Sequence, residues 1–230
     1  FPLSQRPTLA LLLLGSMLLM PSCTQENNEP PTIGVMEDLM AGHERFKRND
    51  THNKADLQAL VQATADGQKP KAVVITCSDS RLVPELIFDQ SIGVLFVIRN
   101  AGNIVDGELE LGSLQFAVEH LGVRNVIVMG HERCGAITAL MSDNAGATGH
   151  LASVLDHLAE ESEERDILEH REDHPDAVHD GVVANIMHGM RALQDMELIK
   201  ANDVQVHGFS YDQSNGTLRS VELPSAHEER

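Results

Sequence analysis

The chain has 230 residues, of which 42% are apolar, 23% are charged and only three are cysteines. This length and apolar content suit one packed globular domain, and they exclude a disordered chain, a fibrous protein and a disulfide-stapled miniprotein. The 17 Lys and Arg residues against 35 Asp and Glu residues give a net charge of −18, which argues against nucleic acid or an anionic membrane surface as a partner.

The first 23 residues are typical of an export signal. Arg6 precedes an almost wholly apolar run at residues 9–20, which at 1.5 Å per residue is too short to cross about 30 Å of hydrocarbon. Ser22 and Cys23 then resemble the lipobox of bacterial lipoproteins, in which the signal is removed and the new N-terminal cysteine carries lipid. An ordinary signal peptide with a chance cysteine is the alternative. We therefore expect a signal peptide at residues 1–23, a tether at 24–32 and a domain at 33–230, in a bacterial protein that is periplasmic or anchored to a membrane only through lipid on Cys23.

Short apolar runs and helical patterns alternate along the predicted domain. The strand candidates are residues 72–76, 94–98, 125–129 and 204–208. The helix candidates are residues 36–46, 55–65, 111–121, 151–158 and 182–193, and Asn215-Gly216 predicts the turn of a terminal hairpin. This alternation indicates an α/β fold with a mostly parallel central sheet, flanked by helices and preceded by an N-terminal helical arm.

Two of the predicted strands end in residues that bind metals. Cys77 follows the first strand, and His131 and Cys134 follow the third. Open α/β sheets place their sites at this carboxyl edge. Two thiolates and one imidazole form a zinc set with one tetrahedral position open, as in catalytic sites. The spacing of His131 and Cys134 predicts that both lie on the first turn of a helix; the alternative is a buried thiol beside a structural histidine.

Three blocks extend this pattern: CSDSR at residues 77–81, RNAGN at 99–103 and GHxxCG at 130–135. In this order the sequence resembles a β-class carbonic anhydrase from about residue 39 to residue 211. The resemblance implies one zinc ion per chain, held by Cys77, His131 and Cys134, and a catalytic dyad of Asp79 and Arg81. It also implies carbon dioxide and bicarbonate as substrates.

The resemblance assigns further roles. Gln68 matches an active-site amide, and Phe96 and Phe116 match aromatic walls of the substrate pocket. Family members are dimers or assemblies of dimers, so a homodimer or a dimer-based oligomer is expected, with residues 36–46 as the arm that embraces the partner. In an inactive closed state of the family, the residue that matches Asp79 becomes a fourth metal ligand.

The expected reaction follows from zinc chemistry. Zinc lowers the pKa of bound water from 15.7 toward about 7, giving a hydroxide that attacks CO2 to form bicarbonate. Asp79, held by Arg81, would accept the proton and orient the hydroxide. Two alternatives stay open: a COS or CS2 hydrolase on the same zinc site, and a zinc-binding lipoprotein without turnover, against which the dyad argues.

Other polar groups predict less. Six of the 12 histidines lie between His150 and His188, and solvated helices explain them better than a second metal site. The acidic run at residues 160–166 predicts an exposed helix face.

Overall fold

The computed structural model describes residues 34–52, 56–142 and 147–224, with no side-chain description for residues 162–164. The expected signal peptide, the tether and Cys23 lie outside the described residues. Among the residues described, no helix combines the length and the apolar character that a membrane crossing requires.

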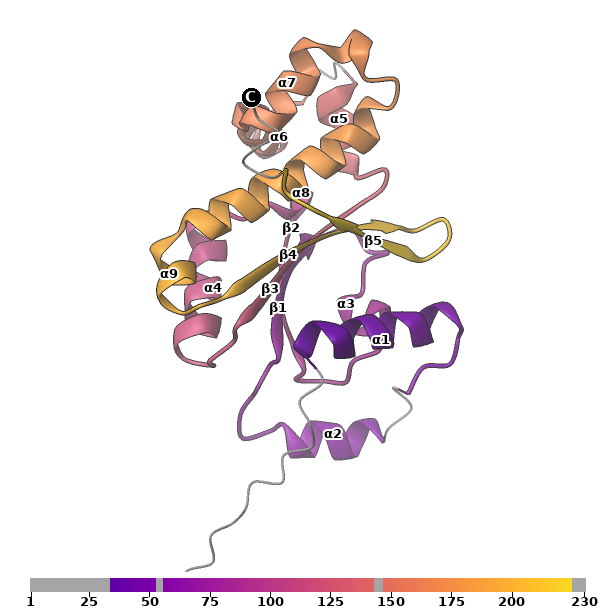
Figure 1. Cartoon of the computed structure of the whole chain (residues 1–230), viewed down its shortest axis with the longest axis vertical. Coiled ribbons are helices and arrows are strands. Elements are labelled where there is room, and N and C mark those ends of the chain that lie inside the picture. Colours follow the sequence, from indigo (N-terminus) through magenta and orange to yellow (C-terminus); the bar gives the residue numbers. More distant parts are fainter. Residues whose placement is uncertain (1–33, 53–55, 143–146, 225–230) are drawn as a thin grey trace, which may run out of the picture. The chain divides into compact units, whose positions relative to one another are not determined.

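A five-stranded sheet forms the centre of the domain (Figure 1). Its strand order is β2-β1-β3-β4-β5; the first four strands are parallel, and β5 runs antiparallel to β4. The central strands β1 and β3 are buried almost throughout, because helices cover both faces of the sheet. The expected α/β class and parallel sheet are confirmed. The strand bounds are β1 Ala72–Cys77, β2 Leu95–Asn100, β3 Asn125–His131, β4 Gln205–Asp212 and β5 Thr217–Val221.

Helices pack on both faces of this sheet. Figure 1 shows α4, α8 and α9 on one face and α1 and α3 on the other. The helix bounds are α1 Val35–Lys47, α2 Leu57–Ala63, α3 Pro84–Ile87, α4 Glu108–Glu119, α5 Gly135–Met141, α6 His150–Glu160, α7 Ser162–Glu169, α8 Ala177–Asp195 and α9 Glu197–Ala201, with the 3-10 turns η1 Ala101–Asn103 and η2 Arg171–Asp173.

Two glycines let α8 lie close to the sheet. A Cβ on Gly130 of β3 would be 2.7 Å from Cδ1 of Ile186, and a Cβ on Gly208 of β4 would collide with the sulfur of Met190. Ile186 of α8 is fully buried where it packs against these two glycines. Because interiors are close-packed, any larger side chain on these strands would push α8 outward.

The predicted hairpin forms, whereas the predicted acidic helix face does not. Gly216 has a φ of 72° in the turn between β4 and β5, and glycine adopts this left-handed conformation without steric strain because it has no Cβ. The prediction that residues 160–166 form one exposed helix face is wrong. The run is divided between two helices, because α6 ends at Glu160 and α7 begins at Ser162, and Glu161 between them is only 6% exposed. Glu161 turns inward because its extended backbone separates the two helices.

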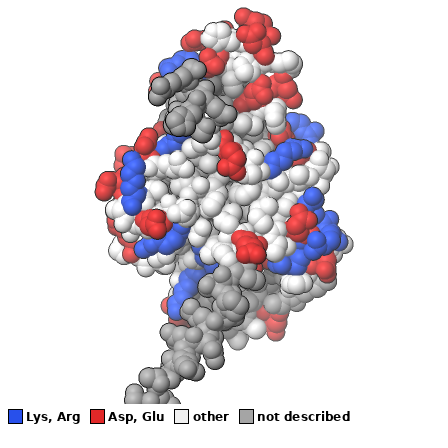
Figure 2. Space-filling model, in the orientation of Figure 1, with Lys and Arg blue, Asp and Glu red and all other residues white. Residues whose placement is uncertain are grey.

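Charged side chains are unevenly spread over the surface. Figure 2 shows both signs scattered over the face drawn in Figure 1, with acidic side chains gathered near the end that carries α6 and α7. The acidic excess in the sequence is therefore a surface property, since ionised carboxylates are costly to bury.

Candidate metal centre

Strand register brings two of the predicted ligands together. Cys77 is the last residue of β1 and His131 the last of β3. Thr76 pairs with Met129 in parallel register, so both strands end at the same edge of the sheet, as the expected site requires.

Cys134 reaches the same place from a turn. The expectation that His131 and Cys134 share the first turn of a helix is wrong, because His131 ends a strand and Cys134 caps the start of α5. Between them Arg133 adopts a left-handed conformation, with a φ of 53°. This turn, and not helical periodicity, brings the second thiol back to the histidine.

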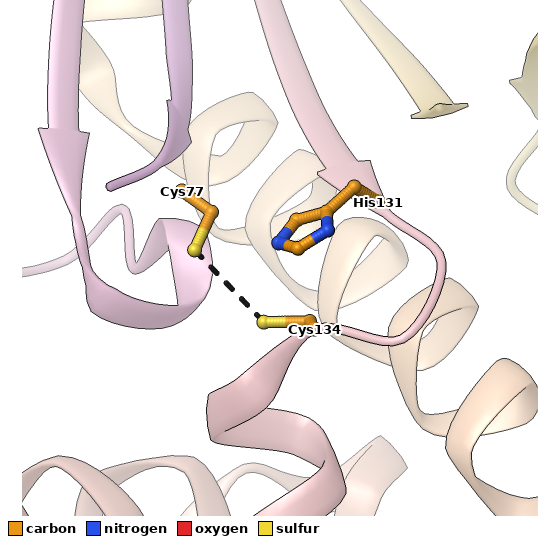
Figure 3. Close-up of side chains that lie close together, drawn as sticks. All are labelled: Cys77, His131 and Cys134. Carbon is orange, nitrogen blue, oxygen red and sulfur yellow. Dashed lines mark hydrogen bonds between the residues drawn. The ribbon is translucent and has the colours of Figure 1, made fainter. Parts of the chain in front are cut away.

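The three side chains point toward one another in Figure 3. The sulfurs of Cys77 and Cys134 are 3.9 Å apart, and all three donor atoms lie within 4.8 Å of one another. Two sulfurs held by one tetrahedral zinc at about 2.3 Å would be about 3.8 Å apart. Nε2 of His131 is buried and has no hydrogen-bond partner among the described residues. A buried nitrogen in this position calls for a ligand, and the donor set fits zinc.

The two thiols share a proton in the absence of metal. The hydrogen bond from Cys134 lowers the pKa of Cys77, with smaller help from His131 and from the backbone N–H groups of Gly102 and Asp79. The same bond, together with burial, raises the pKa of Cys134. The contact therefore favours the thiolate form of Cys77, which is the form that binds metal.

The predicted dyad is present beside the thiols. Arg81 donates from Nε to Oδ1 of Asp79 at 2.9 Å and from Nη2 to Oδ2 at 2.7 Å, a bidentate fork. These bonds hold the pKa of Asp79 well below its usual range. Oδ2 also lies 4.0 Å from Nε2 of His131, so one edge of the carboxylate faces the metal-ligating cluster. Arg99 supports the loop by donating to the backbone oxygens of Cys77 and Asp79.

Two polar contacts of this site were missed in the sequence. The side chain of Gln213, in the turn after β4, contacts Nδ1 of His131. The carboxylate of Glu132 lies 3.0 Å from Nδ1 of His179 and accepts from Ser210 at 3.2 Å. The pairing of His131 with Tyr211 places the β4–β5 turn beside the ligand, and this long-range register has no local sequence signal.

The structure describes all three residues that were matched to the substrate pocket. Phe96 on β2 and Phe116 on α4 contact each other, with ring centroids 6.4 Å apart, and Phe116 is 45% exposed. Gln68 is exposed in the segment between α2 and β1. Their roles beside a substrate stay predictions.

Comparison with known proteins agrees with this geometry. A family model described as carbonic anhydrase matches residues 72–218. Carbonic anhydrase 1 of Escherichia coli O157:H7 is 31% identical over 196 residues, which cover 81% of this chain and 88% of the relative. A solved β-carbonic anhydrase of Aspergillus fumigatus superposes with a TM-score of 0.67 at 26% identity, covering 85% of this chain and 94% of that one.

Other relatives match over shorter stretches. Carbonic anhydrase 2 of Mycobacterium tuberculosis is 35% identical over 130 residues, 55% of this chain and 62% of the relative. The carbonic anhydrase of Pseudomonas aeruginosa is 44% identical over 112 residues, 46% of this chain and 50% of the relative. The chain thus spans less than two thirds of the length of these two relatives. The family model nevertheless covers β1 to β4 and all three predicted ligands, and the chain belongs to the β-class carbonic anhydrase family.

Proposed function

We propose that this chain is a zinc-dependent carbonic anhydrase that reversibly hydrates carbon dioxide to bicarbonate and a proton. The observation that carries the proposal is the buried cluster of Cys77, His131 and Cys134 with the Asp79–Arg81 fork beside it. A purely structural zinc site would be closed by a fourth protein ligand. Here the carboxylate of Asp79 lies 4.0 Å from the unpartnered Nε2 of His131, and it is already paired with an arginine.

The chain supplies three ligands whose two thiolate charges would neutralise one divalent ion. Cys77 and Cys134 would bind as thiolates, and His131 would bind through Nε2, the nitrogen that faces them. When bound, zinc would supply the Lewis acidity that converts water to hydroxide near neutral pH. All three ligand residues are buried, so their donor atoms are shielded from bulk water.

Asp79 would orient the nucleophile. The carboxylate is ionised at working pH because its pKa is so low, and Oδ2 is the oxygen that faces His131. A group with such a low pKa stores a proton poorly, but it accepts a hydrogen bond well. Its part is therefore to hold the O–H of the attacking group and direct a lone pair at CO2. Arg81 keeps this carboxylate from turning onto the metal through two hydrogen bonds.

Assembly and location belong to the same proposal. We propose a dimer-based oligomer in keeping with the family resemblance, and an exported protein in keeping with residues 1–23. Sedimentation of the native protein and the mass of its mature N-terminus test these two points.

The reaction is tested by stopped-flow CO2 hydration with the zinc-loaded protein, before and after chelation. We expect activity that is lost with the metal, and Asp79→Asn should lower the rate by about 100-fold or more, since an amide no longer accepts from the nucleophile as a carboxylate does. Zinc content should stay at one per chain in this variant.

Asp195→Asn is the matched control, because Asp195 is an exposed carboxylate paired with Lys200 and should not affect the rate. If protein with one zinc per chain hydrates CO2 at pH 8.5 no faster than the uncatalysed background rate, the carbonic anhydrase proposal is refuted. The chain would then be a COS or CS2 hydrolase or a non-catalytic zinc protein. An assay for COS hydrolysis distinguishes the hydrolase from the non-catalytic protein. Full activity of Asp79→Asn would refute the role of the dyad.

A further inference from the structure

A second group of metal-ligating side chains lies outside the Cys77, His131 and Cys134 cluster. Nε2 of His157 is 2.8 Å from Oδ1 of Asp106 and 3.8 Å from Oε1 of Glu161. The donor atoms of these three residues all lie within 4.8 Å of one another. A second imidazole, that of His188 on α8, brings its Nε2 to 3.8 Å from the same oxygen of Glu161.

Local and long-range structure combine to form this group. His157 and Glu161 are four positions apart at the end of α6, so they lie on one side of the helix. Asp106 is 51 positions earlier, in the segment between η1 and α4. The sequence gives no sign of this contact for His157, because only the folded chain brings Asp106 to it.

Burial and access suit a bound cation. The side chain of Glu161 is 5% exposed, whereas those of His157 and Asp106 are 35% and 40% exposed. One side of the group is thus dry and the other is open to solvent. A cavity of about 330 Å³, lined in part by Ile104, Gly107 and His157, lies on the open side. An ion can reach His157 through this cavity, and solvent screens the charge of the buried Glu161 carboxylate little.

We propose that Asp106, His157 and Glu161 bind a divalent transition-metal ion, distinct from the ion of the catalytic centre. One imidazole nitrogen and two carboxylate oxygens are ligands that Zn²⁺ accepts readily, whereas ions that require thiolates would not be held. Without an ion, Nε2 of His157 can donate a proton to Oδ1 of Asp106 at 2.8 Å, whereas Oε1 of Glu161, at 3.8 Å, lies beyond hydrogen-bond distance. The ion replaces this proton and offsets the repulsion between the two acidic groups.

The bound ion joins α6 to a segment that supports the catalytic centre. Leu158, next to His157, packs against Gly102 of η1. Gly102 in turn donates its backbone N–H to the sulfur of Cys77, and its carbonyl oxygen accepts from Asn185 of α8 at 2.6 Å. An ion at the second site would therefore make the backing of Cys77 more rigid without touching any group that reacts.

The experiment uses the full chain with its first zinc ion bound. The protein is dialysed to equilibrium against increasing free Zn²⁺, and metal per chain is measured by plasma mass spectrometry. We expect a second equivalent in the wild type that raises the melting temperature, because an ion that binds only the native state stabilises it. His157→Ala and Asp106→Asn should weaken this second binding by about tenfold or more, and the first equivalent should be unchanged.

His150→Ala is the matched control, because His150 is an exposed histidine on the same helix and lies outside the group. It should retain the second equivalent. Asp106 is exposed and its amide variant has almost the same shape, so loss of binding there does not reflect unfolding. Saturation of the wild type at one zinc would overturn the proposal, as would a second equivalent that persists in both variants, which would place the ion elsewhere.

Discussion

At the scale of single residues, the metal centre depends on which nitrogen of His131 carries a proton. Nδ1 lies 3.1 Å from the backbone oxygen of Glu132, which only accepts, so Nδ1 holds the proton and Nε2 offers a lone pair. The side chain of Gln213 contacts the same Nδ1, and its own oxygen is buried with no other hydrogen-bond partner among the described residues. With its amide turned, that oxygen accepts from Nδ1 and fixes the ring for metal binding.

Removing this contact should weaken zinc binding. Gln213→Leu keeps a side chain of similar size but accepts no hydrogen bond, and we expect zinc affinity to fall by about 10–100-fold. Competition with a chromophoric chelator measures the affinity. Gln205→Leu, at the exposed start of β4, is the control and should bind zinc as the wild type does. Equal affinity in Gln213→Leu would show that the backbone of Glu132 orients the ring alone.

At the scale of elements, the sequence predicted the buried strands and the long helices, but not several of the short helices. Apolar runs predicted four strands, because burial on both faces leaves few polar positions in β1 and β3. Their ends were predicted too early, since Cys77 and His131 continue the strands although they serve the site. Helices α3, α5 and α9 have seven residues or fewer, and such helices depend on tertiary packing that no local pattern records.

The residues of the candidate site also fall into those that the sequence predicted and those that it did not. Its ligands and dyad stand in compact motifs at strand ends, and a sequence pattern therefore finds them. Gln213 and Asp106 act across the fold, one through the pairing of β4 with β3 and the other through the packing of α6. Neither has a neighbour in sequence that marks its role.

The contact between α8 and the sheet should carry much of the stability. Ile186 is fully buried against Gly130 and Gly208, and no larger side chain on the strands can fill a gap there. Ile186→Ala should lower the free energy of unfolding by about 2–5 kcal/mol. Urea denaturation measures this change. Leu151→Ala, at a 54% exposed position on α6, should change it by less than about 0.5 kcal/mol; similar losses in both variants would contradict the packing argument.

At the scale of the whole molecule, one buried histidine joins three distant elements. Nδ1 of His43 on α1 donates to the backbone oxygen of Ile87 in α3 at 3.1 Å, and Nε2 accepts from the backbone N–H of Leu218 in β5 at 3.2 Å. Only the neutral ring can make both hydrogen bonds, because a protonated imidazole has two N–H donors and no acceptor. His43 is 2% exposed, and this burial lowers its pKa. The N-terminal helix and the terminal hairpin are thus held together by an uncharged histidine.

Stability should therefore fall in mild acid. The unfolded state takes up a proton near pH 6.5, whereas folded His43 does so only at lower pH, so its contribution is complete above pH 6.5 and is lost as the pH falls toward the folded pKa. The slope from one such group is at most about 1.4 kcal/mol per pH unit. Burial also lowers the pKa of His207, which therefore adds to this slope. Glu132 raises the pKa of His179, and Asp166 raises that of His170, so these two histidines reduce the slope.

The contribution of His43 is isolated by comparing variants. The slope of unfolding free energy between pH 5.5 and 7.5, from urea curves, should be smaller in His43→Gln than in the wild type. His150→Gln, at an exposed position, should leave the slope unchanged. Protonation of His43 near pH 6.5 in a proton NMR titration of the folded protein would contradict this account.

The parallel register of β1 and β3 also fixes an order of events during folding. Cys77 and Cys134 are 57 positions apart, and the crossover through β2 and α4 lies between them. Because parallel pairing must wait for such a crossover to close, Cys77 is far from His131 and Cys134 along the chain until the sheet exists. An ion held by all three residues would therefore bind the finished sheet, and its binding energy would then oppose unfolding. In the proposed enzyme, zinc would complete the centre only after the sheet has formed and would then hinder its disassembly.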